Sequence, residues 1–441
     1  MTAQARRIPP RRGACPGLSA PMSTGDGLLT RFMPIGTIAL AAFKRLCAAA
    51  RTYGNGIMEV TARGSIQIRG LNAVSARQFA DDIATLEIAA QDGVPILCNP
   101  LSGIDAEETI DVTPLAFELR RILAGWPAAA LDAKVSVAID GGAKLNLARV
   151  PADIRLTAQS VNGEVFLRVA VGGDDTGAVD LGQVAPEDGA EAAWRLLGLL
   201  AKRGRHARAR DIIAAEGIAI FREALSARPA LRWAPACADA NKTKQDRQEL
   251  CRDASIFALH RLRDGSLARG IGLAFGHAET GALERLADAA AVAGACGLRA
   301  APDRTLLAIG LTKQSAVDFV VAAEQFGFVT RANDPRRHVL ACAGAPLCAS
   351  AYLATREMAP LIGSAAAPFL AGDTTIHISG CAKGCARPIA ATLTVVGASA
   401  GCALVADGSA RDTPFASVPA KELPAAIERY LRDHKAPQVR V

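Results

Sequence analysis

Residues 36–71 of the chain read GTIALAAFKRLCAAARTYGNGIMEVTARGSIQIRGL, and residues 276–311 read GHAETGALERLADAAAVAGACGLRAAPDRTLLAIGL. The two segments align without a gap at an offset of 240 residues. Three pairs of glycines coincide: Gly36 and Gly276, Gly54 and Gly294, and Gly70 and Gly310. Each pair falls where an element is expected to end, and the period is too long for a solenoid. We interpret the repeat as a duplication that produced two similar halves.

Each copy is predicted to form a strand, a helix and a hairpin, which indicates the α+β class. In the first copy, residues 28–33 form an apolar strand. The next helix has its apolar face at Leu40, Phe43, Leu46, Cys47 and Ala50. Residues 57–61 and 66–69 then form a hairpin around residues 63–64. The second copy repeats the helix face at Leu283, Leu286, Ala287 and Ala290.

The regions that follow the two copies also resemble each other. Residues 134–151 read KVSVAIDGGAKLNLARVP, and residues 374–388 read TTIHISGCAKGCARP. Lys144 aligns with Lys383, and Gly142 aligns with Cys381. Only the second half carries paired cysteines, which is typical of a duplicated scaffold that keeps one metal site.

Four of the eleven cysteines form two close pairs. Cys342 and Cys348 are separated by five residues, and Cys381 and Cys385 by three. The other seven are dispersed: Cys15, Cys47, Cys98, Cys237, Cys251, Cys296 and Cys402. Two pairs of thiolates could hold a [4Fe–4S] cluster or a zinc ion, or they could be buried structural thiols. The glycine-rich surroundings favour the cluster, because glycines let the backbone wrap a bulky inorganic core.

Composition limits the remaining possibilities. The 441 residues carry a net charge of +7, with 50% hydrophobic and 21% charged residues, so the chain can bury a sizeable core. No apolar run reaches the ~18 residues of a membrane span, and three Trp and three Tyr supply few stacking surfaces for nucleic acid. We therefore expect a cytoplasmic protein that binds neither membrane nor nucleic acid. Residues 1–14 are expected to be a flexible basic arm, and residues 172–191 a linker or exposed hairpin.

The cysteine spacing, in the second half of a duplicated chain, resembles the sulfite and nitrite reductase superfamily. Within it, residues 11–34 (RRGACPGLSAPMSTGDGLLTRFMP) and 59–71 (EVTARGSIQIRGL) resemble the precorrin-3B synthases of aerobic cobalamin biosynthesis. The resemblance implies a [4Fe–4S] cluster on the four paired cysteines, with Cys385 equivalent to the cysteine that reductases share with sirohaem. It also implies a monooxygenase that hydroxylates precorrin-3A and closes a lactone, using dioxygen, an external electron donor and a mononuclear non-haem iron.

The same resemblance implies a ferredoxin-like pseudo-symmetric domain and two further α+β domains. We expect the first ferredoxin-like half-domain at residues 15–75 and the first α+β domain, without cluster cysteines, at 76–235. The second half-domain is expected at 253–315. The second α+β domain, which would carry the cluster, is expected at 316–441.

Cationic residues distinguish the possible substrates. Arg63 matches an anion-binding arginine of the reductases, but residues 91–94 lack a second arginine, and Lys134 lacks the second lysine of an expected pair. Sulfite or nitrite reduction needs concentrated positive charge, so these departures argue against a reductase. Carboxylates of a tetrapyrrole would instead be bound by Arg63, Arg69, Lys134 and Lys144. Arg63 and Lys383 are the candidate catalytic residues.

Two other functions remain open from the sequence: a sirohaem-dependent sulfite or nitrite reductase, and a non-enzymatic electron-transfer subunit. His377 alternates with Ile376 and Ile378. It is expected to be a partly buried histidine with a hydrogen-bond partner rather than an iron ligand.

Overall fold

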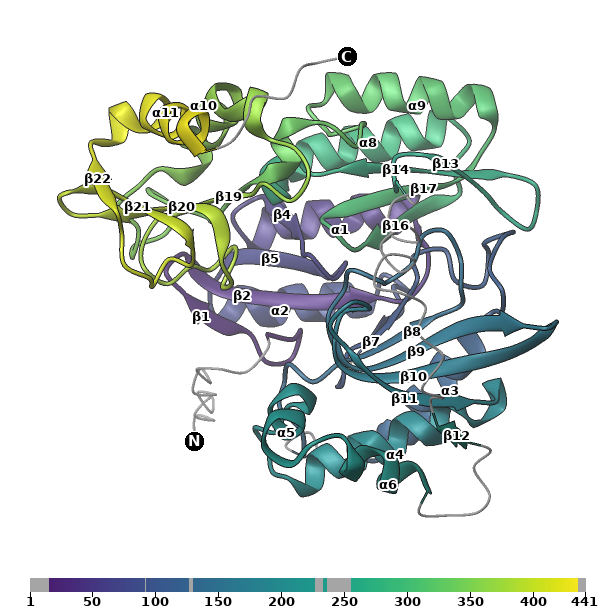
Figure 1. Cartoon of the computed structure of the whole chain (residues 1–441). Helices are drawn as coiled ribbons and strands as arrows, with labels where there is room; N and C mark the ends of the chain where they lie inside the picture. The colour runs from purple at the N-terminus through teal and green to yellow at the C-terminus, as the bar shows by residue number, and fades with distance from the viewer. Residues whose placement is uncertain (1–15, 92, 127–129, 227–232, 236–254, 435–441) are drawn as a thin grey trace, which may run out of the picture.

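The computed structural model describes residues 16–91, 93–126, 130–226, 233–235 and 255–434. A central domain carries both copies of the repeat, and two further domains pack on it (Figure 1). The expected arm at residues 1–14 lies outside the described residues. None of the described helices has the length and apolar content needed to cross a membrane.

Each copy of the repeat builds one antiparallel sheet of the central domain. The first copy contributes β1 (Met22–Thr24), β2 (Gly27–Pro34), β4 (Ile57–Val60), β5 (Ile66–Leu71), α1 (Leu40–Tyr53) and α2 (Ala73–Ala84), and β6 (Ala90–Gln91) pairs with β2. The second contributes β13 (Leu259–Arg261), β14 (Leu267–Gly272), β16 (Gly297–Ala301), β17 (Thr305–Leu311), α8 (Thr280–Val292) and α9 (Lys313–Gln325). The strand orders are β1-β2-β5-β4-β15 and β13-β14-β17-β16-β3.

The two copies exchange a short strand. β3 (Ile38–Ala39) belongs to the first copy but pairs with β16, and β15 (His277–Glu279) belongs to the second copy but pairs with β4. The apolar faces of α1 and α8, which include the fully buried Phe43, Leu46, Leu283 and Leu286, join a single core. The predicted duplication and the α+β class are therefore confirmed, and the halves form one domain.

The hairpins of the two copies meet at the centre of this domain. The turn between β4 and β5 carries Gly64 at φ +80°, where a Cβ would lie 3.0 Å from the carbonyl carbon of Ala301. The backbone nitrogen of Asp303 donates to the carbonyl of Ala62 at 3.1 Å. Only glycine combines this backbone conformation with so close an approach. The meeting of the hairpins fixes Arg63 next to the second copy.

The first flanking domain is a six-stranded sheet covered by helices. The strand order is β12-β11-β10-β9-β8-β7, and β7, β8 and β9 are parallel. The strands are β7 (Ile96–Cys98), β8 (Val137–Asp140), β9 (Ala152–Val161), β10 (Glu164–Gly173), β11 (Val179–Val184) and β12 (Trp233–Pro235). The helices are α3 (Thr113–Leu123), α4 (Gly189–Lys202), α5 (Ala209–Glu216), α6 (Ala219–Ser226) and the 3₁₀ turn η1 (Pro186–Asp188). All four α-helices contribute to the core on one face.

The C-terminal domain repeats this plan with five strands in the order β18-β19-β20-β21-β22. The strands are β18 (Val339–Ala341), β19 (Ile376–Ser379), β20 (Ala391–Ala398), β21 (Gly401–Gly408) and β22 (Ala416–Val418). The helices are α10 (Thr355–Ala366) and α11 (Leu423–His434), with the 3₁₀ turns η2 (Ala274–Gly276), η3 (Pro335–His338), η4 (Ala367–Phe369) and η5 (Ala420–Glu422) elsewhere in the second half. β18, β19 and β20 are parallel, like their counterparts β7, β8 and β9.

Helices α2 and α9 cross the expected boundaries at residues 75 and 315, and Phe79 and Phe319 are buried in the central core. Of the two alternatives for residues 172–191, the hairpin agrees with the structure and the linker does not, because β11 pairs antiparallel with β10 and also with β12. The glycines and aspartates of this segment form the turns on either side of this buried strand, and composition alone does not distinguish these turns from a linker.

Candidate metal centre and the charge network beside it

The four paired cysteines lie in two loops, residues 342–348 and 381–385, at one edge of the C-terminal sheet. These loops follow β18 and β19, which are parallel neighbours. Because parallel strands end at the same edge of a sheet, the two loops emerge side by side. The structure thus brings together cysteines that are more than thirty residues apart in sequence.

The four thiols are close enough to influence one another electrostatically. Burial raises the pKa of the Cys385 thiol, and negative charge on Cys342, Cys381 and Cys348 raises it further. None of these cysteines forms a disulfide. Thiolates gathered in this way repel one another, so a bound cation would stabilise them.

Two glycines near these thiols pack so closely that a larger residue would not fit in their place. A Cβ on Gly25, in the turn after β1, would overlap the sulfur of Cys348. A Cβ on Gly344, at φ +67°, would overlap the hydroxyl of Thr355. The backbone nitrogen of Gly380 donates to the sulfur of Cys342 at 3.2 Å. Amide donors to cysteine sulfur are a recognised feature of iron–sulfur sites, where they tune the potential.

The arrangement fits a cluster with several irons. Within the described part of the chain, no three His, Cys, Asp or Glu side chains converge closely enough to hold a single metal ion. A [4Fe–4S] cluster does not need such convergence, because each cysteine binds a different iron atom. The gathered thiols, the close glycines and the amide donor therefore suit the cluster.

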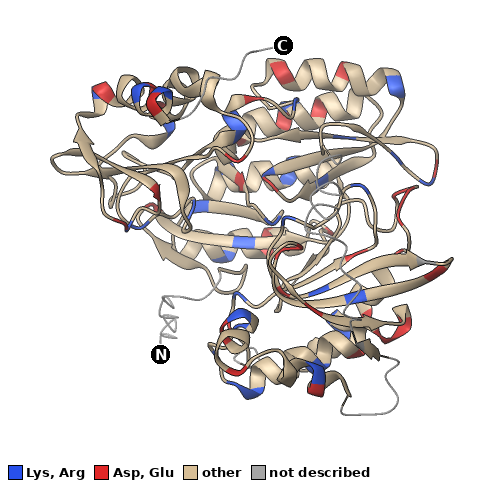
Figure 2. Cartoon of the chain, viewed as in Figure 1, with Lys and Arg blue, Asp and Glu red and all other residues tan. Residues whose placement is uncertain are grey.

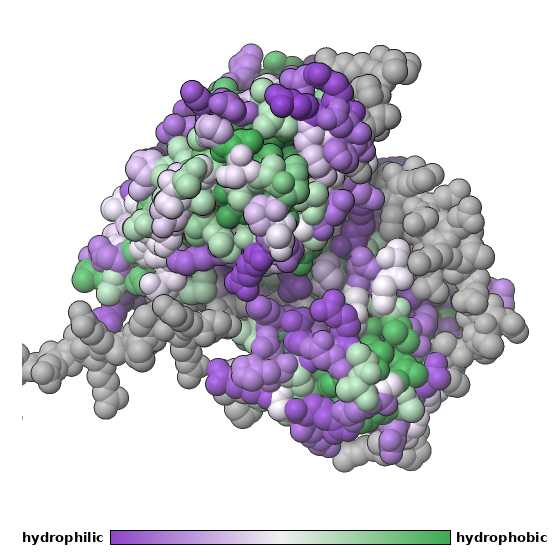
Figure 3. Space-filling model, turned by 60° about the vertical axis from the view of Figure 1, so that its left-hand side comes forward, coloured by the Kyte–Doolittle hydropathy of each residue, from purple (hydrophilic) through white to green (hydrophobic). Residues whose placement is uncertain are grey.

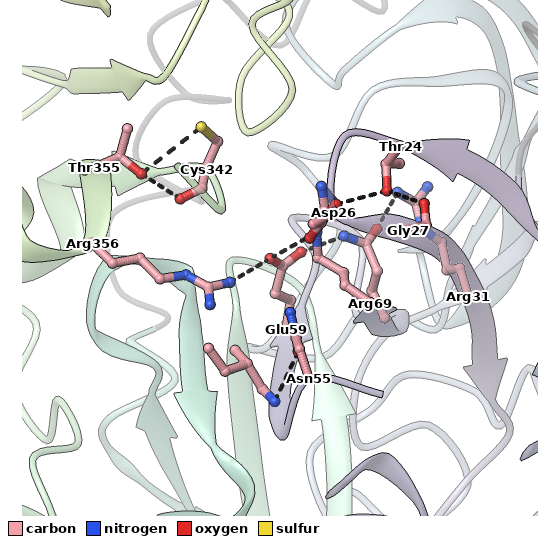
Figure 4. A network of polar contacts seen from close by, with 12 residues as sticks. Thr24, Asp26, Gly27, Arg31, Asn55, Glu59, Arg69, Cys342, Thr355 and Arg356 are labelled. Carbon is pink, nitrogen blue, oxygen red and sulfur yellow. Dashed lines mark hydrogen bonds and ion pairs between the residues drawn. The ribbon is translucent and has the colours of Figure 1, made fainter. Parts of the chain in front are cut away.

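A row of polar side chains crosses the sheet next to the cysteine loops (Figure 4). Arg31 on β2, Gln67 on β5 and Glu59 on β4 stand directly opposite one another. The Nε of Arg31 donates to Oε1 of Gln67 at 3.1 Å, and Nε2 of Gln67 donates to Glu59. Polar side chains on a buried face must find partners, and this row satisfies them across three strands.

Two more arginines join the row to form a charge network, defined as Asp26, Arg31, Glu59, Gln67, Arg69 and Arg356. Arg69 lies 2.9 Å from Asp26 and 3.8 Å from Glu59, and Arg356 lies 3.4 Å from Glu59. Burial alone would lower the pKa of Arg69, but Glu59 and Asp26 raise it overall. The network thus combines three guanidinium groups with two carboxylates.

The charge network continues to the cysteine loops. The hydroxyl of Thr355, next to Arg356, donates to the carbonyl of Cys342 at 2.7 Å. Two nitrogens of Arg356, Nε and Nη1, are buried without a hydrogen-bond partner among the described residues. Burial is the main cause that lowers the pKa of Arg356. The guanidinium of Arg356 is therefore only partly satisfied by Glu59 within the described part of the chain.

His377 lies deeper than the sequence indicates. It is fully buried, and neither ring nitrogen has a hydrogen-bond partner among the described residues. Burial lowers its pKa to about 4, helped by Arg387 and Arg304. The expectation of a partly buried histidine with a partner was therefore wrong. The reason is that alternate residues of β19 face the helices, and His377 faces the opposite side of the sheet.

The pseudo-equivalent place on the second copy of the repeat is apolar. Leu307 and Ile309 occupy the positions of Gln67 and Arg69 at the offset of 240 residues. They belong to a small buried cluster with Leu101, Leu145, Leu262, Ala268 and Ala301. Of the two pseudo-equivalent places, one is thus filled with hydrocarbon and the other with thiols and charge, which locates the candidate site between the first copy of the repeat and the C-terminal domain.

The predicted catalytic and substrate-binding residues do not all lie at the cysteine loops. Lys383, between two cysteines, donates from Nζ to the hydroxyl of Ser350 at 2.9 Å and so links the two loops. Arg63 donates to the carbonyl of Pro151 at 3.1 Å. Lys144 pairs with Glu107 at 2.8 Å on the surface, and the exposed Lys134 lies at the other end of β8. Only Arg69 and Lys383 are adjacent to the cysteine loops.

Residues 91–94 lack the second anion-binding arginine of the reductases, but the structure places another arginine beside them. Arg120 extends from α3, and its Nε donates to Oε1 of Gln91 at 3.2 Å. A guanidinium therefore reaches this place from a different element. A motif search near residue 91 cannot detect it, since the two side chains are 29 positions apart in sequence.

Sequence analysis also missed most of the charge network. Asp26, Glu59 and Arg356 come from three elements, and no local pattern connects them. One signal was present: Gln67 and Arg69 alternate with isoleucines in an otherwise apolar strand. Alternating residues share a face, so two polar groups on a buried strand indicate polar partners opposite them.

The surface around the site is mixed in character. Acidic and basic residues are interspersed over the domains in Figure 2, as the modest net charge predicts. The C-terminal domain exposes large apolar side chains at Leu347, Tyr352, Leu361, Ile389 and Phe415. Figure 3, which turns this domain forward, shows apolar surface on it. Leu347 directly precedes Cys348, so part of the outer surface of the cysteine loops is apolar.

Comparison with known proteins gives consistent results. Residues 20–85 match the nitrite/sulfite reductase ferredoxin-like half domain. A precorrin-3B synthase from Sinorhizobium sp is 39% identical over 422 residues, which are 95% of this chain and 88% of that protein. A ferredoxin sulfite reductase from Mycolicibacterium paratuberculosis is 24% identical over 80% of this chain and 66% of its own length. The structure of Mycobacterium tuberculosis NirA superposes with a TM-score of 0.72 at 21% identity, covering 94% of this chain and 82% of that one.

Proposed function

Because this chain belongs to the precorrin-3B synthase family, within the nitrite and sulfite reductase superfamily, we propose that it is an oxygen-dependent monooxygenase of cobalamin biosynthesis. It would convert precorrin-3A to precorrin-3B by hydroxylation and lactone formation. The observation that carries the proposal is the gathering of Cys342, Cys348, Cys381 and Cys385 beside the charge network, in a chain 39% identical to a precorrin-3B synthase.

The four cysteines would hold a [4Fe–4S] cluster. When bound, such a cluster supplies single electrons and has no open coordination position. The chain's own residues set its surroundings: the amide of Gly380 bonds the sulfur of Cys342, and Lys383 holds the loops together through Ser350. The ammonium group of Lys383, between two of the cysteines, would favour the reduced, more negative state of the cluster. The proposal also includes a non-haem iron, to which we assign no ligands.

Monooxygenation places one oxygen atom of dioxygen in the product and reduces the other to water, so an external donor must supply two electrons. Labelled dioxygen tests this reaction. The new hydroxyl oxygen should carry the label, and turnover of precorrin-3A should stop under argon. Equal turnover without dioxygen, or label that arrives only from water, would defeat the proposal.

The same sample tests the alternatives. Sirohaem adds strong visible absorption bands that a cluster alone lacks, so an absorption spectrum separates a sirohaem reductase from the proposed enzyme. Sulfite reduction by sirohaem-loaded protein would favour the reductase. A protein that transfers electrons but leaves precorrin-3A unchanged in the presence of dioxygen would favour an electron-transfer subunit.

Arg63 is proposed to bind a substrate carboxylate, because its planar fork can do so with two hydrogen bonds. Replacing Arg63 with alanine should weaken substrate binding by ~1.5–3 kcal/mol, the value of a charged hydrogen bond. Equilibrium titration with precorrin-3A under argon measures this loss, and the iron content should not change. Arg331→Ala is a suitable control, because Arg331 is 74% exposed and its ion-pair partner among the described residues is Glu324. Equal affinity of the two variants would show that Arg63 has no role in binding.

A further inference from the structure

A cavity of about 470 Å³ lies where the first flanking domain meets the central domain. Its walls come from the end of β2, the turn between β4 and β5, the end of β7, the start of α3, and β16. Its volume is typical of a site for a small organic ligand. In the flanking domain that forms one side of it, the loops after β7 and β8 carry no paired cysteines.

Three arginines line this cavity: Arg63, Arg120 and Arg299. None of its lining residues is acidic. Arg120 donates to the side chain of Gln91 at 3.2 Å and to the carbonyl of Ile96 at 3.3 Å. Arg299 donates to the hydroxyl of Thr37 at 2.7 Å and to two carbonyls, those of residues 100 and 102. These acceptors orient the guanidinium groups but do not neutralise them.

The nearby acidic groups have other partners. Glu108 acts electrostatically on Arg299, but its carboxylate is bound to Arg263 at 2.9 Å. No carboxylate of the described residues lies within ion-pair distance of Arg120 or Arg299. The cavity is therefore positively charged, and burial, the main cause, lowers the pKa of Arg299. An anion bound here would relieve the cost of burying this charge.

The wall also contains polar groups that lack partners. Asn99 and Ser102 are 2% and 5% exposed, and Nδ2 of Asn99 and Oγ of Ser102 have no hydrogen-bond partner among the described residues. Each unpaired buried group costs free energy. Both groups can donate to an oxygen. Met33, Leu97 and Leu147 are among the apolar side chains of the lining.

We infer that this cavity binds the carboxylates of an organic anion, with Arg120 and Arg299 acting together with Arg63. A carboxylate accepts bidentate hydrogen bonds from arginine, and the apolar lining would hold a hydrocarbon chain. The carboxylates come either from the side chains of a tetrapyrrole or from a separate small polycarboxylate. The tetrapyrrole as source rests on the proposed function, whereas a separate polycarboxylate does not.

Arg120→Gln, compared with Arg121→Gln, tests the inference. The two arginines are neighbours on α3, but Arg121 points to solvent, where it pairs with Glu118 and is 65% exposed. The probes are uroporphyrin, a stable tetrapyrrole with eight carboxylates, and citrate. Affinity is measured by fluorescence quenching for uroporphyrin and by calorimetry for citrate, under argon and without turnover.

Uroporphyrin binding that falls about tenfold or more in Arg120→Gln but not in Arg121→Gln, with citrate as a competitor, assigns the cavity to the tetrapyrrole. Citrate binding that falls by this factor while uroporphyrin binding is unchanged assigns it to a separate anion. Unchanged affinity for both probes overturns the inference. Because no oxygen chemistry is involved, failure of the oxygenase proposal would leave this result unaffected.

A second variant guards against a folding defect in Arg120→Gln. Phe117 lies on the cavity wall and is 68% exposed, so Phe117→Asp should leave the fold intact. The added carboxylate places negative charge at the opening. The affinity for the bound probe should fall several-fold, and less so at high salt, which screens exposed charges. Equal affinities in Phe117→Asp and wild type would also overturn the inference.

Discussion

Replacing Cys381 with serine is expected to reduce the bound iron and sulfide of the purified protein to near background and to abolish turnover of precorrin-3A. The thiolate is the form of cysteine that binds metal, and a serine hydroxyl does not ionise at neutral pH. The remaining three thiols are held at one edge of the sheet, so losing one ligand breaks the set. Iron and sulfide analysis and electron paramagnetic resonance of the reduced protein measure the effect.

The same result is expected for Cys342, Cys348 and Cys385, and a matched control is available. Cys296 is exposed and belongs to the central domain. Cys296→Ser should retain the iron content and the spectrum of the wild type. A wild-type cluster signal in all four loop variants would overturn the assignment of these cysteines as ligands.

The duplication could be predicted from the sequence because its signals are local. The helix faces of α1 and α8 follow the 3- and 4-residue spacing of a buried stripe, and the predicted residues Leu46 and Leu286 are fully buried. The hairpin around Gly64 was likewise visible in the alternation of the flanking strands. Each of these features depends on residues within about fifteen positions of one another.

The strand exchange could not be predicted in this way. β3 and β15 contain two and three residues, too few to show a periodic pattern. Their partners lie more than two hundred residues away in the sequence. Pairing of this kind is decided by the packing of α1 against α8, which places each short strand beside the sheet of the other copy.

In the candidate site too, features within a short stretch of sequence could be predicted and long-range contacts could not. The spacing of the cysteines identified the loops, because a ligand set of this type is short-range within each pair. The partners of Arg69 were not identifiable, since Asp26 precedes it by 43 residues and Arg356 lies in the other half of the chain. The guanidinium of Arg120 beside Gln91 escaped detection for the same reason.

Removing Asp26 is expected to have the largest effect on stability. Asp26 and Arg69 form an ion pair at 2.9 Å with side chains only 2% and 7% exposed. Asp26→Ala leaves Arg69 buried, with Glu59 at 3.8 Å as its remaining counter-ion and Arg356 nearby. Breaking one side of a buried pair costs about 3–5 kcal/mol. The urea midpoint should therefore fall clearly below that of the wild type.

An exposed ion pair supplies the control for this comparison. Glu118 and Arg121 pair on the surface of α3, with side chains 43% and 65% exposed. Such pairs contribute ~0–1 kcal/mol, so Glu118→Ala should move the midpoint little. Midpoints are the appropriate measure, because a chain of several domains does not unfold in a single step. Equal midpoints in Asp26→Ala and Glu118→Ala would show that the buried pair has no special role in stability.

A double variant separates stability from function. In the second copy of the repeat, Ile309 occupies the position of Arg69, and Ser266 occupies that of Asp26. The scaffold therefore folds with an apolar residue at this place. Replacing a whole buried ion pair with apolar side chains is often neutral or stabilising, so Asp26→Ser with Arg69→Ile should recover most of the stability lost in Asp26→Ala. If it does so while turnover remains low, the charge network is retained for the chemistry beside the cysteines, because the fold is stable without it.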